Sequence, residues 1–395
     1  MKDFPVSIPS PLGREHRSQR KILFVNAGIR DFLSHRLHLA YRMREVGFEV
    51  HVAGPVELGI DKIIAEGFRF HPIPLRRKSA NPAHEIRCLL ALVNLYRKLK
   101  PSIVHQFMLK PSLYGGIAAR VLDSGGAVSM ITGFGHLTMA ENLQARLLRI
   151  PVRWGLRFAL GSENAVAMFQ NPDDRELFVK SGIVRASDSC LIPGSGIDPA
   201  EFFPTPEPSG TPIVLLAGRM LWVKGVGEFV SAARILRKSG STARFALAGQ
   251  IDSGHPSDVS LQQLHAWETE GIVEWWGWHD DVPALVSSVT LCCLPSYREG
   301  LPRVLVEACA GGRAVVTTDT PGCREVVRHG LNGLLVPVGD SGALADAIQF
   351  LLENPRRRAE MARCGREVVM ARFTRDRVIT ETLAVYNKLL DHNSE

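Results

Sequence analysis

The first half of the chain alternates short, continuous apolar segments with longer segments in which apolar residues recur every three or four positions. The short segments are rich in β-branched residues and predict strands, whereas the longer ones predict amphipathic helices. Because the strand segments are not interrupted by polar residues, both faces of each strand should be covered, which predicts a parallel, doubly wound α/β sheet. The series includes strands at Ile22–Asn26, Phe48–Ala53, Ser102–Gln106 and Ala165–Gln170, and a helix at Leu33–Val46.

A proline-rich segment, Phe203–Pro212, separates this series from a second one. Its four prolines within ten residues exclude a helix or a central strand, so we place a domain boundary there. The same alternation then restarts and predicts a second sheet of the same class. The expected elements are strands at Ile213–Ala217, Arg244–Ala248, Val289–Pro295 and Ala314–Thr318, helices at Gly225–Lys238 and from Pro302, and two last helices within Pro355–Leu390.

Four parts of the chain are therefore expected. Residues 1–20 form a loose basic tail, and residues 21–204 and 205–372 form an N-terminal and a C-terminal Rossmann-like domain. Residues 373–395 form a helix that packs back on the N-terminal domain. Two such domains facing each other create a cleft at the carboxyl ends of their strands, where open α/β sheets bind ligands.

Length and composition agree with this organisation. A chain of 395 residues is long enough for two domains, and its formal charge of +7 favours anionic partners such as phosphates or acidic lipid surfaces. The basic residues are dispersed without interleaved aromatics, so nucleic acid is not an expected partner. Seven cysteines without C-x-x-C spacing indicate buried, reduced thiols in a cytoplasmic protein. No apolar run reaches the roughly 18 residues that cross a membrane.

The most informative segment is Leu294–Gly312, LPSYREGLPRVLVEACAGG. Glu299 follows an expected strand, and Glu307 lies eight residues later inside the expected helix. Carboxylates so placed can address different parts of one extended ligand, and the helix N-terminus between them suits a phosphate. An alternative stays open, in which Glu299 only caps the helix and Glu307 is a solvated helix residue.

A second cluster, AGRMLWVKG, also connects a strand end to a helix start. Arg219 and Lys224 lie five residues apart there and could neutralise a diphosphate leaving group as its charge develops. They could equally be two surface charges on an ordinary turn. Trp278 and His279 follow a further strand and are candidates to contact a planar base, although clustered tryptophans are more often core residues.

Strand ends of the first domain supply further candidates. Gly28 follows the first strand, near a helix start where an acceptor phosphate could bind, but the G-x-G-x-x-G pattern of dinucleotide sites is absent. Lys110 in HQFMLK and His136 in TGFGH follow other strands on the same side of the sheet. For each histidine in these segments, a structural role is the competing interpretation.

Four arginines recur at three- and four-residue spacing among apolar residues, at Arg146, Arg149, Arg153 and Arg157. This basic stripe on an amphipathic helix suits an anionic membrane surface, and a solvated basic face is the alternative. Pro151 within the run is expected to kink or divide the helix.

Taken together, these motifs resemble those of the family 4 retaining glycosyltransferases, which share the two-Rossmann-domain architecture called GT-B. The resemblance extends from Lys21 to Tyr386 and includes shorter segments similar to bacterial enzymes that extend sugars on undecaprenyl diphosphate, namely DFLSHRLHLA, HQFMLKPSLYGGIAAR and ITGFGHL. The donor-side motifs that carry it are Glu299-x7-Glu307 within PSYREGLPRVLVEA, GRMLWVKG, TDTPGCREVVRHGLNGLLVP and IPGSGID.

The resemblance assigns roles to individual residues. Glu299 would contact the transferred sugar, Glu307 the nucleotide ribose, and the amides of Gly300 and Leu301 the sugar and phosphate. Arg219 and Lys224 would bind the diphosphate. The sequence departs from many relatives in having the single Gly28 in its first loop, NAGIRD, and Gly133 or Phe134 where a histidine is common.

The resemblance also implies a reaction. A hexose or N-acetylhexosamine would pass from a nucleotide-diphosphate sugar, with UDP favoured, to a lipid-diphosphate-linked saccharide in surface polysaccharide assembly. Retention would come from same-face attack, with the two basic side chains in place of a metal and with no cofactor. The protein would then be cytoplasmic and peripheral on the inner face of the cell membrane. A non-catalytic sugar-nucleotide-binding or membrane-docked scaffold, or a GT-B sugar-nucleotide epimerase, stays as an alternative.

Overall fold

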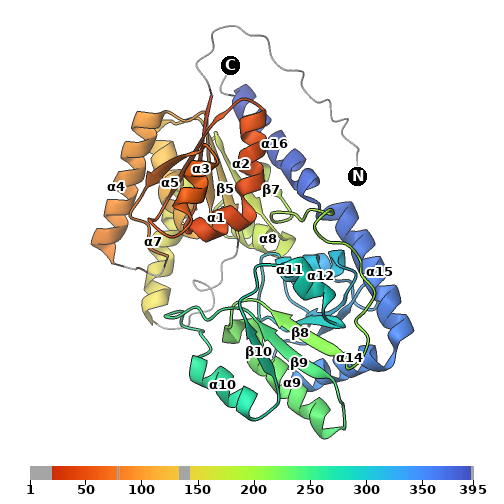
Figure 1. The fold of residues 1–395 in the computed structure, drawn as a ribbon. Helices are drawn as coiled ribbons and strands as arrows, with labels where there is room; N and C mark the ends of the chain where they lie inside the picture. Colours follow the sequence, from red (N-terminus) through yellow and green to blue (C-terminus); the bar gives the residue numbers. More distant parts are fainter. Residues whose placement is uncertain (1–19, 78, 80, 133–142, 393–395) are drawn as a thin grey trace. The chain divides into compact units, whose positions relative to one another are not determined.

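The computed structural model describes residues 20–77, 79, 81–132 and 143–392, which form two parallel sheets (Figure 1). The first sheet has seven strands in the order β3-β2-β1-β4-β5-β6-β7. Its strands are β1 (Lys21–Val25), β2 (Glu49–Gly54), β3 (Arg69–Pro72), β4 (Ile103–Phe107), β5 (Gly126–Ile131), β6 (Ala165–Phe169) and β7 (Ser189–Leu191). The helices of this region are α1 (Ile29–His35), α2 (Leu37–Glu45), α3 (Ile60–Ala65), α4 (Pro82–Leu99), α5 (Leu109–Leu122), α7 (Leu143–Leu160) and α8 (Pro172–Lys180).

The second sheet has six strands in the order β10-β9-β8-β11-β12-β13. Its strands are β8 (Ile213–Ala217), β9 (Arg244–Ala248), β10 (Glu274–Gly277), β11 (Leu291–Leu294), β12 (Ala314–Thr318) and β13 (Leu334–Val336). The helices are α9 (Val226–Lys238), α10 (Leu261–Thr269), α11 (Val282–Ser287), α12 (Arg303–Ala310), α13 (Cys323–Val326), α14 (Ser341–Glu353), α15 (Pro355–Arg372) and α16 (Arg375–His392). The expected fold class, two doubly wound α/β sheets, is confirmed.

The described residues divide into two compact units. Strands β1 to β4 belong to the first unit, together with Gly155–Val166 and the described residues from Val385 onward. The second unit includes the whole range Ala167–Ala384, and strands β8 to β13 lie within it. The boundary expected after residue 204 stays a prediction.

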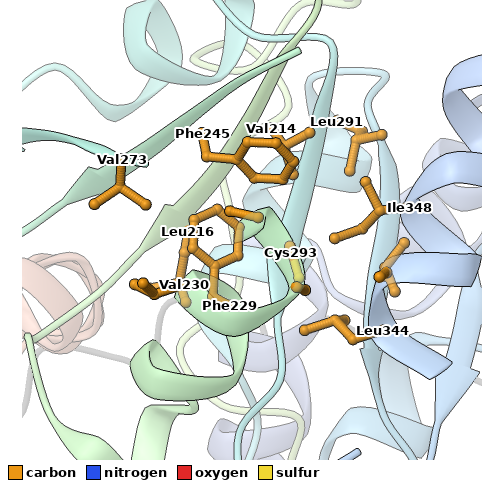
Figure 2. Close-up of a cluster of buried hydrophobic side chains, with 14 of the residues drawn as sticks. Val214, Leu216, Phe229, Val230, Phe245, Val273, Leu291, Cys293, Leu344 and Ile348 are labelled. Atoms are coloured by element: carbon orange, nitrogen blue, oxygen red, sulfur yellow. The ribbon is translucent and has the colours of Figure 1, made fainter. Parts of the chain in front are cut away.

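Strand β8 shows why an unbroken apolar segment becomes a central strand. Val214 and Leu216 face an apolar layer that includes Phe229 of α9 and Ile348 of α14, and Figure 2 shows these side chains gathered together. Leu215 points to the opposite face and joins a second apolar cluster. Each of these strand residues is fully buried, and such a side chain contributes about 1.5–3 kcal/mol of transfer free energy. Burial on both faces fixes the position of β8, the strand that precedes Arg219 and Lys224.

Two local expectations need correction. The helix expected over Leu33–Val46 is two helices, because the backbone at Arg36 leaves helical geometry (φ −127°, ψ −13°) between α1 and α2. The Arg36 guanidinium lies 4.4 Å above the centre of the Phe107 ring. Pro151 does not divide the basic helix, since α7 continues across it to Leu160.

All seven cysteines are free thiols, and five of them are buried. Within the described ranges, no helix has both the length and the apolar character that a bilayer crossing needs. The same ranges contain no group of three or more His, Cys, Asp or Glu side chains placed to hold a metal ion.

Candidate active site

The candidate site lies where the strand order of the second sheet reverses. Strands β8 and β11 are neighbours at its centre, although β9 and β10 lie between them in the chain. Ligands of doubly wound sheets bind outside the carboxyl ends of the strands at this switch point. The segment with Arg219 and Lys224 follows β8, and the loop with Glu299 follows β11. The fold therefore brings both sequence motifs to the switch point.

The two loops touch through their backbones. The Tyr297 amide donates to the Val223 carbonyl at 3.0 Å. Gly225 has φ +74°, and a Cβ there would lie 2.1 Å from the Pro295 carbonyl oxygen. Only glycine permits this approach, because any side chain would displace one loop from the other.

Lys224 and Glu299 form the centre of the site. The Lys224 Nζ lies 2.5 Å from Glu299 Oε1, and the two side chains are 21% and 10% exposed. The Ser296 hydroxyl donates to the same oxygen at 2.7 Å. Helix α12 begins after Pro302 without any side-chain cap, so the alternative in which Glu299 caps this helix is wrong.

Arg219 contacts a residue that the sequence did not single out. Its Nη1 lies 2.7 Å from Asp252 Oδ2, in the segment that follows β9. The Arg219 side chain is 39% exposed, so this ion pair contributes little stability and the guanidinium keeps access to solvent. An acidic residue just after a strand of this sheet, in AGQID, is the signal that could have drawn attention to Asp252.

Glu307 is buried within the second helix turn after the loop. Only 6% of the residue is exposed, and Arg303 Nε donates to its Oε1 at 2.6 Å. Burial raises the pKa of the Glu307 carboxyl above its usual value, although the Arg303 charge opposes this shift. The alternative in which Glu307 is a solvated helix residue is therefore wrong.

A third loop closes around Gly300 and Leu301. Gly322, after β12, has φ +81°, and a Cβ there would lie 2.5 Å from the Glu299 carbonyl oxygen and 2.6 Å from that of Gly300. The Leu301 side chain packs against the second apolar cluster. The backbone of this loop is thus held from two sides, which suits the amide contacts that the resemblance assigns to it.

The three clustered tryptophans differ in environment. Trp275 and Trp276 pack against the two apolar clusters of the second unit, as core residues do. Trp278 is 60% exposed, and its Nε1 donates to Asp280 at 2.7 Å. The His279 ring accompanies Trp276, with ring centres 6.2 Å apart. Trp278 therefore remains the accessible candidate for contact with a base.

Gly28 and Lys110, the candidate acceptor-binding residues near the first sheet, each have a carboxylate nearby, which disfavours the binding of an anion there. The Glu57 carboxylate accepts from the Ile29 amide at 3.1 Å, directly after Gly28. Lys110 donates to the Arg76 carbonyl at 2.8 Å and to Glu85 at 2.8 Å. His136 lies outside the described residues.

His105, in strand β4 of this sheet, has the buried environment that is typical of a structural histidine. His105 is fully buried, and its Nδ1 lies 2.5 Å from the Tyr386 hydroxyl of α16. Burial lowers the pKa of His105, and the charge of Arg36 lowers it further. His35 instead lies 4.0 Å from Asp31 on the surface of α1.

Comparisons with known families match two separate parts of the chain. Residues 211–354 match the family described as "Glycosyl transferases group 1", and residues 21–160 match "Glycosyl transferase 4-like". The chain is 27% identical over 355 residues to the N,N'-diacetylbacillosaminyl-diphospho-undecaprenol alpha-1,3-N-acetylgalactosaminyltransferase of Campylobacter jejuni, covering 84% of this chain and 91% of that protein. It is 21% identical over 309 residues to the UDP-Gal:alpha-D-GlcNAc-diphosphoundecaprenol alpha-1,3-galactosyltransferase of Escherichia coli, covering 75% and 77%.

Solved structures agree on the fold. Sucrose-phosphate synthase from Thermosynechococcus elongatus superposes with a TM-score of 0.78 at 20% identity, covering 95% of this chain and 100% of that one. The Anabaena protein HepE in complex with UDP and glucose gives 0.71 at 18% identity, covering 92% and 98%.

Proposed function

The chain belongs to the family 4 glycosyltransferases of GT-B fold, and from this premise we propose that it is a retaining enzyme acting on a nucleotide-diphosphate sugar. It transfers a hexose or N-acetylhexosamine to a lipid-diphosphate-linked saccharide. The contact between Lys224 and Glu299 at the switch point carries the proposal. In a nucleotide sugar the transferred sugar is bonded directly to the terminal phosphate, so a phosphate-binding cation and a sugar-binding carboxylate must lie side by side.

The chemistry follows from these neighbours. Lys224 and Arg219 stabilise the negative charge that develops on the departing diphosphate, in place of a metal ion. A leaving phosphate oxygen accepts the proton of the acceptor hydroxyl, which attacks from the same face and retains the anomeric configuration. Glu299 is held by a cation and a hydroxyl, which suits a group that positions the sugar and stabilises charge.

The names of relatives suggest the substrates. HepE was crystallised with UDP and glucose, and the Escherichia coli relative is named for UDP-galactose and an undecaprenol-linked acceptor. We therefore assign a UDP-sugar as donor and a sugar on undecaprenyl diphosphate as acceptor. Glu307 would bind the ribose, Trp278 and His279 the base, and Gly28, Lys110 and His136 the acceptor.

A membrane-facing surface would bring the enzyme to such an acceptor. On α7, Ile150, Trp154 and Phe158 recur every four residues and are 61%, 66% and 44% exposed. Arg153 and Arg157 are exposed on the same stretch of the helix, a composition that suits anionic lipid headgroups around an apolar contact. The side chains of Arg146 and Arg149 lie outside the described residues. We propose peripheral binding to the inner face of the cell membrane through this stretch of α7.

A donor screen tests the enzymatic proposal. Purified protein is incubated with UDP- and GDP-sugars and a lipid-diphosphate-linked sugar, and nucleotide release and product mass are followed. Glu299→Gln should reduce transfer at least about 100-fold, because a carboxylate that acts in the transition state is lost. Arg219→Ala should raise the Kd for UDP roughly 10-fold or more, because a charged contact to phosphate is lost.

Arg234→Ala is the matched control. Its side chain is 36% exposed and forms an ion pair with Glu270, much as Arg219 does with Asp252, but it lies on α9 away from the loops of the site. This variant should bind UDP and transfer sugar normally. Wild-type turnover by Glu299→Gln would overturn the proposed function, and release of free nucleotide and sugar without a lipid product would favour a reaction other than transfer.

A further inference from the structure

We propose that Ser296 is a positioning residue that reserves one oxygen of Glu299 for the donor sugar. This inference rests on the proposed function, because it gives Ser296 a role only through Glu299. Ser296 lies within the PSYREGLPRVLVEA motif, but the resemblance assigns a role to Glu299 and Glu307 and none to this serine.

Both contacts to Glu299 fall on the same oxygen. The Ser296 Oγ lies 2.7 Å and the Lys224 Nζ 2.5 Å from Oε1. Within the described residues, no side chain or backbone group hydrogen-bonds to Oε2. A carboxylate held at one oxygen presents the other in a fixed direction, so Oε2 is the atom left for a sugar hydroxyl.

The single proton of Ser296 has a preferred acceptor. Three oxygens lie near its Oγ, namely Glu299 Oε1 at 2.7 Å, the Val223 carbonyl at 3.1 Å and the Arg298 carbonyl at 3.4 Å. The Val223 carbonyl already accepts from the Tyr297 amide. The carboxylate is both the nearest and the charged acceptor, so it takes the proton.

Ser296 is also the more rigid of the two groups that hold Glu299. It is completely buried two residues after β11 ends, and the Thr318 hydroxyl of the neighbouring strand donates to its carbonyl. Lys224 carries its charge on a flexible four-carbon side chain that can turn toward a diphosphate. When the donor draws Lys224 away, Ser296 keeps Oε1 in place, so Glu299 stays oriented during the reaction.

The test separates sugar positioning from nucleotide binding. Ser296→Ala should lower kcat for transfer roughly 10- to 100-fold, the effect of losing one hydrogen bond to a charged group. The Kd for UDP, which has no sugar, should change less than about 2-fold, since this contact does not reach the nucleotide. Ser296→Thr, which keeps a hydroxyl, should recover part of the lost kcat.

Thr317→Val is the matched control. Thr317 is equally buried on the adjacent strand, but its hydroxyl donates to the Leu294 carbonyl at 2.6 Å and not to Glu299. It should lose stability without a comparable loss of kcat. A Ser296→Ala variant with wild-type kcat would overturn this inference, and so would one in which UDP binding and stability fall in step with kcat. Either result leaves the proposed function intact, provided that Glu299→Gln is inactive. An active Glu299→Gln would instead remove the premise.

Discussion

At the scale of single residues, Glu307 combines a proposed binding role with an unfavourable environment. It is buried on α12, and burial raises its pKa even though Arg303 lies 2.6 Å away. The folded protein therefore retains the Glu307 proton at pH values where the unfolded chain has lost it. Ionisation of this carboxyl therefore lowers the stability of the folded protein as the pH rises from 4.5, the ordinary pKa of the group, through its raised pKa in the folded state. The whole of this loss of stability remains at neutral pH.

We predict that Glu307→Gln stabilises the protein at pH 7.5, because the amide carries no charge to desolvate. Thermal unfolding of both proteins across pH should show this difference in Tm shrinking toward pH 4. The Kd for UDP should rise roughly 10-fold, because a charged acceptor for ribose hydroxyls is lost.

Glu270→Gln provides the contrast. The hydrogen bond from Arg234 lowers the pKa of Glu270, so this substitution should not stabilise the protein at pH 7.5 and should leave UDP binding unchanged. A Glu307→Gln variant that is less stable than the wild type at neutral pH would contradict the predicted sign.

At the scale of elements, the site depends on loops that approach one another at glycines. Gly225 precedes α9 in the left-handed region, against the carbonyl of Pro295, the residue that follows β11. This contact joins the loop with Lys224 to the loop with Glu299. The close approach, and not helix propensity, explains why this position needs glycine.

Gly225→Ala should therefore lose at least about 3 kcal/mol in urea unfolding and should weaken UDP binding, because the two loops are forced apart. Gly240 has a similar φ of +89°, but a Cβ there would meet no atom within 4 Å, so Gly240→Ala should lose only about 1–2 kcal/mol and bind UDP normally. Equal losses in the two variants would show that backbone strain alone, and not loop contact, governs this position.

At the scale of the whole molecule, the charge of +7 and the exposed face of α7 should act together at a membrane. Vesicles that contain anionic phosphatidylglycerol should bind the protein, and binding should weaken in roughly 0.5 M salt, because screening shortens the range of electrostatic attraction. Trp154→Ala should reduce this binding in a sedimentation assay.

Phe350→Ala, a change at a 43% exposed aromatic on α14, is the control and should bind vesicles as the wild type does. Equal binding to neutral phosphatidylcholine vesicles would show that anionic charge is not required. Unaltered binding by Trp154→Ala would refute the assignment of this helix face.

Central strands were accessible from the sequence, because an apolar segment that is buried on both faces can be recognised without its neighbours. Val214, Leu215 and Leu216 illustrate this in β8. The break between α1 and α2 was not accessible, because it occurs at Arg36, whose guanidinium lies over Phe107 from a distant strand. Family 4 membership followed from the motifs around Glu299 and Arg219, while their roles stay predictions.

The sequence by itself determined the two α/β sheets and the motif residues, since periodicity and spacing are local properties of the chain. Only the tertiary structure decided that Lys224 and Ser296 both contact the same carboxylate oxygen of Glu299, and that Asp252 lies beside Arg219. The reason is that Arg219 and Asp252 are 33 residues apart, and Lys224 and Glu299 are 75 residues apart. The strand order that brings their loops together is not visible in any one segment of the sequence.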